Sequence, residues 1–168
     1  MIMMNTGNNN RGLSLIELVV TMSILAILAT VIFPTTRVTA KRLKELELRK
    51  DLRVMRTAID DYNKCYLDAV IQKKIPAMMD DQKAAYPKSL DVLVEGYDFG
   101  GLYGYKRRFL RKIPVDPFNP PPPGEKPKWG LRSSVDQPDS STWGEENVYD
   151  VYSLSEETAI DGTKYKDW

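Results

Sequence analysis

The chain has 168 residues, a length that fits one domain of ordinary size or a smaller domain with an appended segment. Its 24 Lys and Arg nearly balance its 23 Asp and Glu, so it lacks the basic excess that nucleic-acid binding requires, and we expect no nucleic-acid partner. The absence of histidine and the single cysteine, Cys65, exclude histidine chemistry, an intramolecular disulfide and multi-cysteine metal sites, but leave open a carboxylate-only hydrolase or a metal site with oxygen ligands.

The N-terminal part of the chain joins a polar stretch to a long apolar run. Residues 1–12 are polar and rich in asparagine, whereas residues 13–33 carry one charge, Glu17. A helix over this run rises about 31 Å, enough to cross a hydrocarbon core of about 30 Å. We therefore predict a membrane-spanning helix at 13–34. A buried core helix is the first alternative, although the run is apolar on every face and no similar apolar element follows to cover it.

A cleaved secretory signal peptide is the second alternative for this segment. Signal peptides have a shorter apolar stretch, followed by a cut at small residues. Here the run is too long and continues without such a break into a polar helix. We therefore expect the segment to stay with the protein as its anchor.

Glu17 is the most informative residue of the apolar run. A carboxylate inside a bilayer costs roughly 2.5–3.5 kcal/mol, so it usually has a partner or a function. A glutamate near the helix start that reaches the membrane interface is the simpler explanation. Arg11 and Gly12 directly precede the run, and Glu17 is the fifth residue after the bond between Gly12 and Leu13.

This N-terminal pattern resembles the type IV pilin and type II secretion pseudopilin superfamily, with Pro34 where many members end the membrane segment. The resemblance implies a leader at 1–12, a prepilin peptidase that cuts between Gly12 and Leu13 on the cytoplasmic face, and N-methylation of Leu13. Phenylalanine is more frequent at the position of Leu13, so this residue departs from the pattern. In an assembled filament, the Glu17 carboxylate of one subunit would pair with the Leu13 ammonium of a neighbour. The residues carrying the likeness are Arg11, Gly12, Leu13, Ser14, Leu15, Ile16, Glu17 and Leu18.

The charge distribution and the family resemblance predict opposite orientations of the anchor in the membrane. Arg11 precedes the apolar run, and four basic residues follow it within 37–44. A positive-inside count therefore places the C-terminal side in the cytoplasm. The resemblance instead implies a single-pass protein of the bacterial inner membrane, with residues 35–168 forming a periplasmic globular domain.

Beyond Pro34, where we expect a kink or local unwinding, an amphipathic helix continues. Its apolar side chains recur every three or four residues, which predicts one core-facing stripe. The stripe consists of Leu48, Leu52, Met55, Ile59, Tyr62, Tyr66 and Val70. Cys65, near the end of this helix, reads as a buried thiol without assigned chemistry.

The C-terminal half predicts short elements separated by long loops. Residues 87–94 indicate a short helix with Ser89 or a neighbour as its cap, and 128–133 and 147–153 indicate strands. Four prolines at 120–123 predict an extended loop, either a rigid connector or a proline-rich ligand. The fold class is therefore α+β, with a long N-terminal helix packed on a small antiparallel sheet, as in pilins.

Charge is segregated along the chain. Residues 37–56 hold eight basic and three acidic residues, whereas the chain from 133 onward holds nine acidic and two basic. This asymmetry predicts head-to-tail association between copies, with plain solvated faces as the alternative.

The C-terminal half narrows the resemblance to the major, G-type, pseudopilin of type II secretion. The likeness lies in Tyr86 and Pro87, in segments 109–110, 113–118 and 151–154, and in Trp168. It implies a structural homo-oligomeric subunit of a periplasmic pseudopilus that drives export of folded proteins, and not an enzyme. Its implied partners are minor pseudopilins, an inner-membrane assembly platform, the prepilin peptidase and, before assembly, membrane lipid.

Three alternatives to the major pseudopilin remain open. The first is a type IV pilin subunit, and the second is a membrane-anchored binding module. The third is a membrane-anchored enzyme that would use carboxylates such as Asp116 and Asp150, which no motif singles out.

The G-type resemblance also implies a calcium ion in the loop after the final strand. Calcium takes six to eight oxygen ligands. Glu157 stands where the family has an aspartate, Asp161 is the nearest later carboxylate, and Leu154 begins the loop. The loop is shorter than usual and lacks a glycine-rich stretch, so an acidic surface turn held by its own hydrogen bonds is the alternative.

Overall fold

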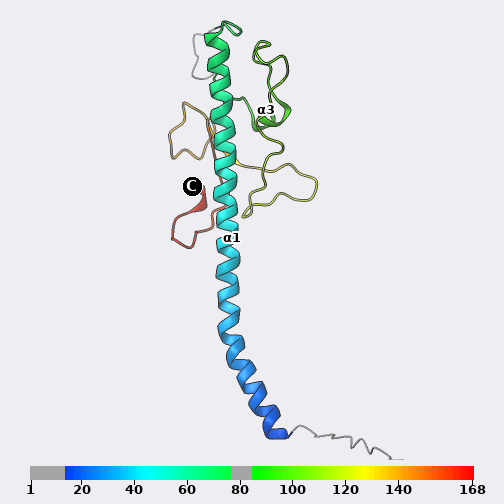
Figure 1. The fold of residues 1–168 in the computed structure, drawn as a ribbon. Helices are drawn as coiled ribbons and strands as arrows, with labels where there is room; N and C mark the ends of the chain where they lie inside the picture. Colours follow the sequence, from blue (N-terminus) through cyan, green and yellow to red (C-terminus); the bar gives the residue numbers. More distant parts are fainter. Residues whose placement is uncertain (1–13, 77–84) are drawn as a thin grey trace, which may run out of the picture. The chain divides into compact units, whose positions relative to one another are not determined.

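The computed structural model describes residues 14–76 and 85–168, with the side chains of 31–36 left out. Its dominant element is α1, Leu15–Ile71, a helix of 57 residues (Figure 1). Helical backbone continues through Pro34, so the local unwinding expected at this proline does not occur. The chain divides into two compact units, Met1–Ala40 and Lys41–Trp168.

In the first unit, the described part of α1 carries an apolar surface. The side chains from Ser14 to Leu28 are all exposed, among them Leu15 and Ile27 at 81% and 66%. In the part of the chain that the structure describes, no helix reaches the length and hydropathy of a membrane span. The span expected at 13–34 is described only in part, because Leu13 and the side chains of 31–36 lie outside the described residues.

The second unit is built around the apolar stripe of α1. Six of the seven stripe residues are buried, from Leu48 to Tyr66, and Val70 is half-buried. Facing them are Leu93, Phe99, Val148 and Tyr165, which are also buried. This burial confirms the predicted stripe as the core-facing side of α1. A helix with one apolar face is stabilised when other residues cover that face.

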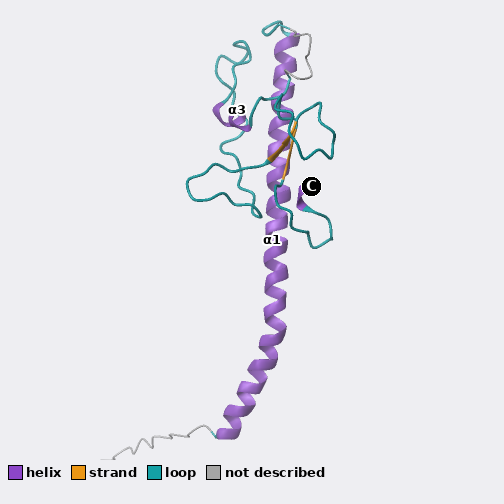
Figure 2. Ribbon diagram, turned by 180° about the vertical axis from the view of Figure 1, so that it is seen from behind, coloured by secondary structure: helices purple, strands orange, loops and turns teal. Residues whose placement is uncertain are grey.

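The remaining elements are short. α3, Leu90–Glu95, begins after Ser89, whose side chain makes no capping hydrogen bond. β1, Gly130–Arg132, pairs antiparallel with β2, Asp150–Tyr152, so that Leu131 faces Val151 (Figure 2). Both strands fall inside the predicted ranges, and 120–123 lie outside any helix or strand, as predicted. The chain closes with the 3-10 helix η1, Tyr165–Asp167.

One structural feature positions the sheet on α1, and a second brings its two strands together. Val151 of β2 is fully buried in the core shared with the stripe. Gly130 lies under the ring of Tyr152, where an added Cβ would approach within 2.3 Å of the ring. The glycine therefore lets the aromatic ring cross β1 closely, which holds the two strands together despite their length.

Candidate functional site

The N-terminal site begins at the first turn of α1. Leu18 N donates to Ser14 O at 3.1 Å, and Glu17 lies in this turn with an exposed side chain. A carboxylate is favoured here because the free N–H groups at a helix start carry partial positive charge. Among the described residues, no basic side chain pairs with Glu17. The predicted cleavage and methylation residues, Gly12 and Leu13, lie outside the described residues.

The hydroxyl groups that follow Glu17 bond back to their own helix. Thr21 Oγ1 donates to Leu18 O at 3.0 Å, and Ser23 Oγ donates to Val19 O at 2.7 Å. Thr30 makes the same kind of bond at 2.7 Å. Hydroxyls that are satisfied within the helix do not need water, so these polar residues are compatible with an apolar environment. Glu17 is then the one charge on an otherwise self-satisfied segment between Ser14 and Thr30.

In the second unit, one polar face of α1 holds the C-terminal segment. Lys41 Nζ donates to Thr158 O at 2.5 Å. Glu45 Oε1 accepts hydrogen bonds from Ile160 N at 2.8 Å and from Tyr165 Oη at 2.9 Å. Burial, helped by the hydrogen bond to Glu45, raises the pKa of the Tyr165 phenol above its ordinary value. The ring of Tyr165 therefore stays neutral and fixed against the helix.

Arg49 extends this contact by one helical turn. Its Nη2 atom lies 3.3 Å from Asp161 Oδ2, and its guanidinium lies 4.2 Å from the centre of the Trp168 ring. Both side chains of the ion pair are about half exposed, at 55% and 50%, so the pair adds little free energy by itself. Together with the Glu45 contacts, however, it fixes the segment 158–168 along α1.

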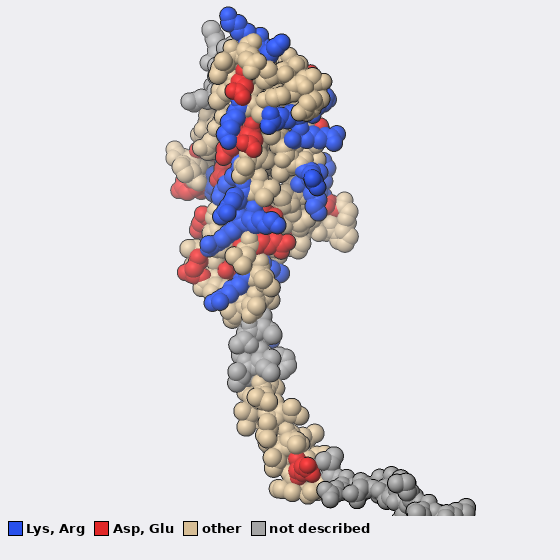
Figure 3. Space-filling view, viewed as in Figure 1, with Lys and Arg blue, Asp and Glu red and all other residues tan. Residues whose placement is uncertain are grey.

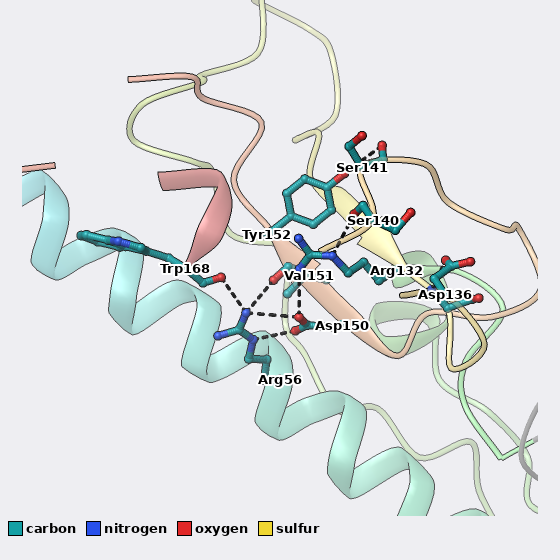
Figure 4. A network of polar contacts seen from close by, with 10 residues as sticks. Arg56, Arg132, Asp136, Ser140, Ser141, Asp150, Val151, Tyr152 and Trp168 are labelled. Atoms are coloured by element: carbon teal, nitrogen blue, oxygen red, sulfur yellow. Dashed lines mark hydrogen bonds and ion pairs between the residues drawn. The ribbon is translucent and has the colours of Figure 1, made fainter. Parts of the chain in front are cut away.

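Arg56 is the centre of a second polar network (Figure 4). Its Nε donates to Asp150 Oδ1 at 2.7 Å, and its Nη2 donates to Val151 O at 3.1 Å and to Trp168 O at 2.8 Å. Arg132 Nη1 lies 3.4 Å from Asp150 Oδ2 on the other side. One carboxylate between two arginines thus ties α1, both strands and the C-terminal residue together.

These contacts give part of the charge segregation a role within the chain. Within this chain, Arg49 and Arg56 pair with Asp161 and Asp150. Head-to-tail association between copies stays a prediction. Sequence reasoning considered a contact with another copy or a solvated face, and it did not consider a contact with the C-terminal segment of the same chain. A signal was present, since Lys41, Glu45, Arg49 and Arg56 follow one another at spacings of four, four and seven, which places them on one helix face.

The expected calcium loop is held by its own hydrogen bonds. Ala159 N donates to Thr163 O at 2.7 Å, and Tyr165 N donates to Glu157 O at 3.3 Å. The Asp161 carboxylate accepts from Thr163 Oγ1 at 2.6 Å as well as from Arg49. The bonds from Thr163, and to a smaller extent the charge of Arg49, lower the pKa of Asp161.

This geometry does not fit a calcium ion. The described residues contain no group of three or more acidic or cysteine side chains that could hold a metal. The backbone oxygen of Glu157 already accepts a hydrogen bond from Tyr165 N, Leu154 has only its backbone oxygen to offer, and Asp161 faces an arginine that would repel a cation. The loop has the internal hydrogen bonds of the alternative, a self-bonded acidic turn. We therefore propose that it holds no calcium ion, which the Tm experiment in the Discussion tests.

The two carboxylates considered for an enzyme both have structural partners. Asp116 is buried and accepts from Ser153 Oγ at 2.6 Å and Phe118 N at 2.8 Å. Asp150 is held by Arg56, as described above. Cys65 is buried in the core, as expected.

Comparison with known proteins adds a match at the N-terminus. Residues 7–33 match the prokaryotic N-terminal methylation motif, and this range contains Gly12, Leu13 and Glu17. The match supports a type IV pilin-like or pseudopilin-like protein. No curated protein and no solved structure matches the chain.

Proposed function

We propose that this chain is a filament-forming subunit of the type IV pilin-like class, anchored in a membrane by its N-terminal helix and processed between Gly12 and Leu13 by a prepilin peptidase. The observation that carries the proposal is the methylation motif at 7–33, which coincides with an exposed apolar helix surface and a single first-turn carboxylate. An apolar helix with no cover in its own unit needs lipid or the helices of other subunits around it. A filament supplies such helices after the subunit leaves the lipid.

Glu17 would specify how subunits meet. Cleavage before Leu13 creates an α-ammonium group four residues from Glu17, and the two charges suit a pair between neighbouring subunits. In a surrounding of low dielectric an unpaired charge costs several kcal/mol, so misaligned subunits would be disfavoured. The absence of a basic partner for Glu17 among the described residues of its own chain leaves this carboxylate available for a neighbour.

A finer proposal is that the filament is a type II secretion pseudopilus and that this chain is its major subunit. Support comes from the two C-terminal segments that resemble the G-type pseudopilins, 113–118 and 151–154. The buried hydrogen bond from Ser153 to Asp116 joins these two segments directly. The two segments therefore form one buried polar contact in the core of the second unit.

The finer proposal implies a specific cellular location and specific partners. The chain would sit in the bacterial inner membrane as a single-pass protein, with its C-terminal domain in the periplasm. Its partners would be minor pseudopilins and an inner-membrane assembly platform. A type IV pilin subunit would share the processing and the filament but would form a longer surface fibre.

The first experiment is intact mass measurement and N-terminal sequencing of the membrane-extracted chain, produced with and without a prepilin peptidase. We expect a chain that begins at N-methylated Leu13 only when the peptidase is present. A chain that begins at Met1 in both cases would indicate an ordinary, unprocessed membrane anchor. A cut after the apolar run would indicate a domain that is released from the membrane. Either result contradicts the proposal.

A second experiment tests the role of Glu17 with a matched control. Glu17→Ala should be processed normally but should enter filaments poorly, as counted by electron microscopy. Glu47→Ala removes an exposed glutamate from the same helix in the second unit and should assemble as the unmodified chain does. Normal assembly and stagger of Glu17→Ala filaments would show that the pairing role is wrong.

A further inference from the structure

The second unit carries a dense basic segment that the contacts described so far do not use. Five of the seven residues at 106–112 are Lys or Arg. The side chains of Lys106, Arg108, Arg111 and Lys112 are exposed. Figures 1 and 2 show that α3 and the chain that follows it lie on one side of α1, and that the loop between β1 and β2 lies on the other.

Among the described residues, the basic segment makes few contacts that compensate its charge. Arg107 lies over the ring of Tyr103 at 4.8 Å, and Arg108 Nε contacts the backbone oxygen of Glu95 at 3.4 Å. Within 14–76 and 85–168, no carboxylate forms an ion pair with Arg108 or Arg111. These two arginines flank an open pocket of about 630 Å³ that is also lined by Val94, Phe109 and Leu110 and by one carboxylate, Glu95. Two arginines against one glutamate leave the pocket with a basic excess.

The loop between β1 and β2 is the acidic counterpart of this segment. Asp136 Oδ2 accepts hydrogen bonds from Ser133 N at 2.7 Å and Gly144 N at 3.1 Å, which closes the loop on itself. Asp139 and Glu145 are exposed on this closed loop, and no basic side chain of the described residues pairs with either. Because the loop is already ordered, binding through it costs little conformational entropy.

The two arginines and the two exposed carboxylates just named on these surfaces form no ion pair among the described residues, unlike the arginines that hold the C-terminal segment on α1. The arginines of α1 at positions 49 and 56 already pair with the chain's own aspartates. Figure 3 shows basic side chains on the flank where α3 lies, further basic side chains over the middle of the unit, and several acidic side chains at the opposite margin. Opposite charges on opposite flanks favour a contact between two different surfaces of like molecules, which propagates along a row.

We propose that the basic segment 106–112 of one copy receives the acidic loop 135–146 of a second copy of this chain. Arg108 and Arg111 would pair with Asp139 and Glu145, and the pocket between the arginines would take the tip of the loop. The proposal rests on the proposed filament, and it names the contact that joins neighbouring globular domains. The head-to-tail attraction predicted from the charge segregation would then act between segment 106–112 and loop 135–146, and not through the basic residues of α1.

The test is disulfide trapping between two differently tagged full-length copies, one with Arg111→Cys and the other with Glu145→Cys, produced together with the prepilin peptidase and the assembly machinery. Cys65 is buried and stays in both copies. The matched control replaces Arg111→Cys with Arg53→Cys, another exposed arginine without a described ion pair. The cysteines replace one of the two proposed charge pairs, so one pair remains. We expect the 111/145 pair to give a mixed disulfide in about fivefold excess over the 53/145 pair, in line with one exposed ion pair.

Charge exchange gives a second, independent readout. Arg111→Glu should reduce cross-linking at an unrelated filament position, and adding Glu145→Arg to the same chain should restore it, whereas Arg53→Glu should have no effect. Loss without restoration would mean that Arg111 meets another partner, such as an anionic lipid surface, and would overturn the proposal. Equal yields for the 111/145 and 53/145 pairs would overturn it as well.

Electron microscopy of the same samples separates this contact from the proposed function. Filaments without the specific cross-link would overturn the contact alone. The cross-link without filaments would support the contact and count against the filament. Neither filaments nor the cross-link would overturn both.

Discussion

Arg56 of α1 and Asp150 of β2 form an ion pair in which Nε lies 2.7 Å from Oδ1, between residues 94 positions apart in the chain. The side chains are 39% and 25% exposed, so the pair lies at the edge of the core rather than in open solvent. The same guanidinium donates to the backbone oxygens of Val151 and Trp168. The Arg56 side chain therefore holds both the sheet and the C-terminal residue against α1.

Removing this guanidinium should weaken the second unit. Arg56→Ala leaves Asp150 and two backbone oxygens with fewer donors, and we expect a loss of about 1–2 kcal/mol in the free energy of unfolding, given the partial exposure of the pair. The measurement is urea unfolding of the full-length chain in detergent, followed by fluorescence of the three tryptophans, which all lie in this unit. Arg53→Ala, at an exposed neighbour, should change the unfolding free energy by less than about 0.5 kcal/mol. Equal losses for the two variants would show that the network adds no stability.

The orientation of α1 in the second unit can be tested with two leucines of the same helix. Leu48 is fully buried, whereas Leu46 is 65% exposed. Leu48→Ala removes packed atoms and leaves a cavity, which should cost about 2–5 kcal/mol, while Leu46→Ala should stay within about 0.5 kcal/mol. The same urea unfolding measures both variants. A large loss for Leu46→Ala in assembled filaments alone would indicate that this side chain is covered by another subunit.

The parts of the fold that follow local patterns were predictable from the sequence. The stripe from Leu48 to Val70 repeats with the helix period, and the segments around Leu131 and Val151 alternate as strands do. The strand ends were less predictable, since three-residue strands are defined by pairing with each other and not by their own residues. Proline usually interrupts a helix, yet α1 continues through Pro34.

The contacts of the C-terminal segment could not be derived from local pattern. Glu45 and Tyr165 are 120 positions apart, and nothing near either residue indicates the other. The charge segregation predicted attraction between copies, whereas Arg49 and Arg56 form their ion pairs within the chain. Sequence separation hides such pairs, because opposite charges far apart in a chain can meet within one fold or between two.

Alkaline pH should destabilise the second unit through Tyr62. Burial, with smaller contributions from Tyr97 and Tyr66, raises the pKa of the Tyr62 phenol above its ordinary value of 10.0. The unfolded chain therefore ionises this group first, so its contribution to stability is complete below about pH 10 and is lost as the pH rises further. Tyr62→Phe keeps the ring and removes the ionisation, and it should flatten the fall in unfolding free energy between about pH 9 and pH 11.

Tyr105→Phe is the control for this pH dependence, because Tyr105 is 66% exposed. It should leave the alkaline fall unchanged when urea midpoints are compared across the same pH range. If both phenylalanine variants follow the curve of the unmodified chain, then the fall arises from other groups, and burial of the Tyr62 phenol does not control it.

Asp161 allows the expected calcium site and the observed turn to be told apart. Its pKa is lowered chiefly by hydrogen bonds from Thr163 and less by Arg49. A lowered pKa in the folded state stabilises the fold above the ordinary value of 3.8, and this contribution is lost as the pH falls through the lower folded value. The turn therefore predicts that Asp161→Asn reduces the Tm at neutral pH, and that this difference shrinks as the solution is acidified.

Calcium should leave this behaviour unchanged. A carboxylate already held by Arg49 and Thr163 offers a calcium ion one ligand beside a positive charge, whereas the ion requires six to eight oxygens. We expect the Tm of the full-length chain in detergent to be the same with excess calcium and with a chelator. Asp167→Asn is the matched control, since this aspartate lies on η1 outside the turn. A Tm that rises with calcium in the unmodified chain and in Asp167→Asn, but not in Asp161→Asn, would instead establish a metal site at Asp161 and would require Arg49 to leave it.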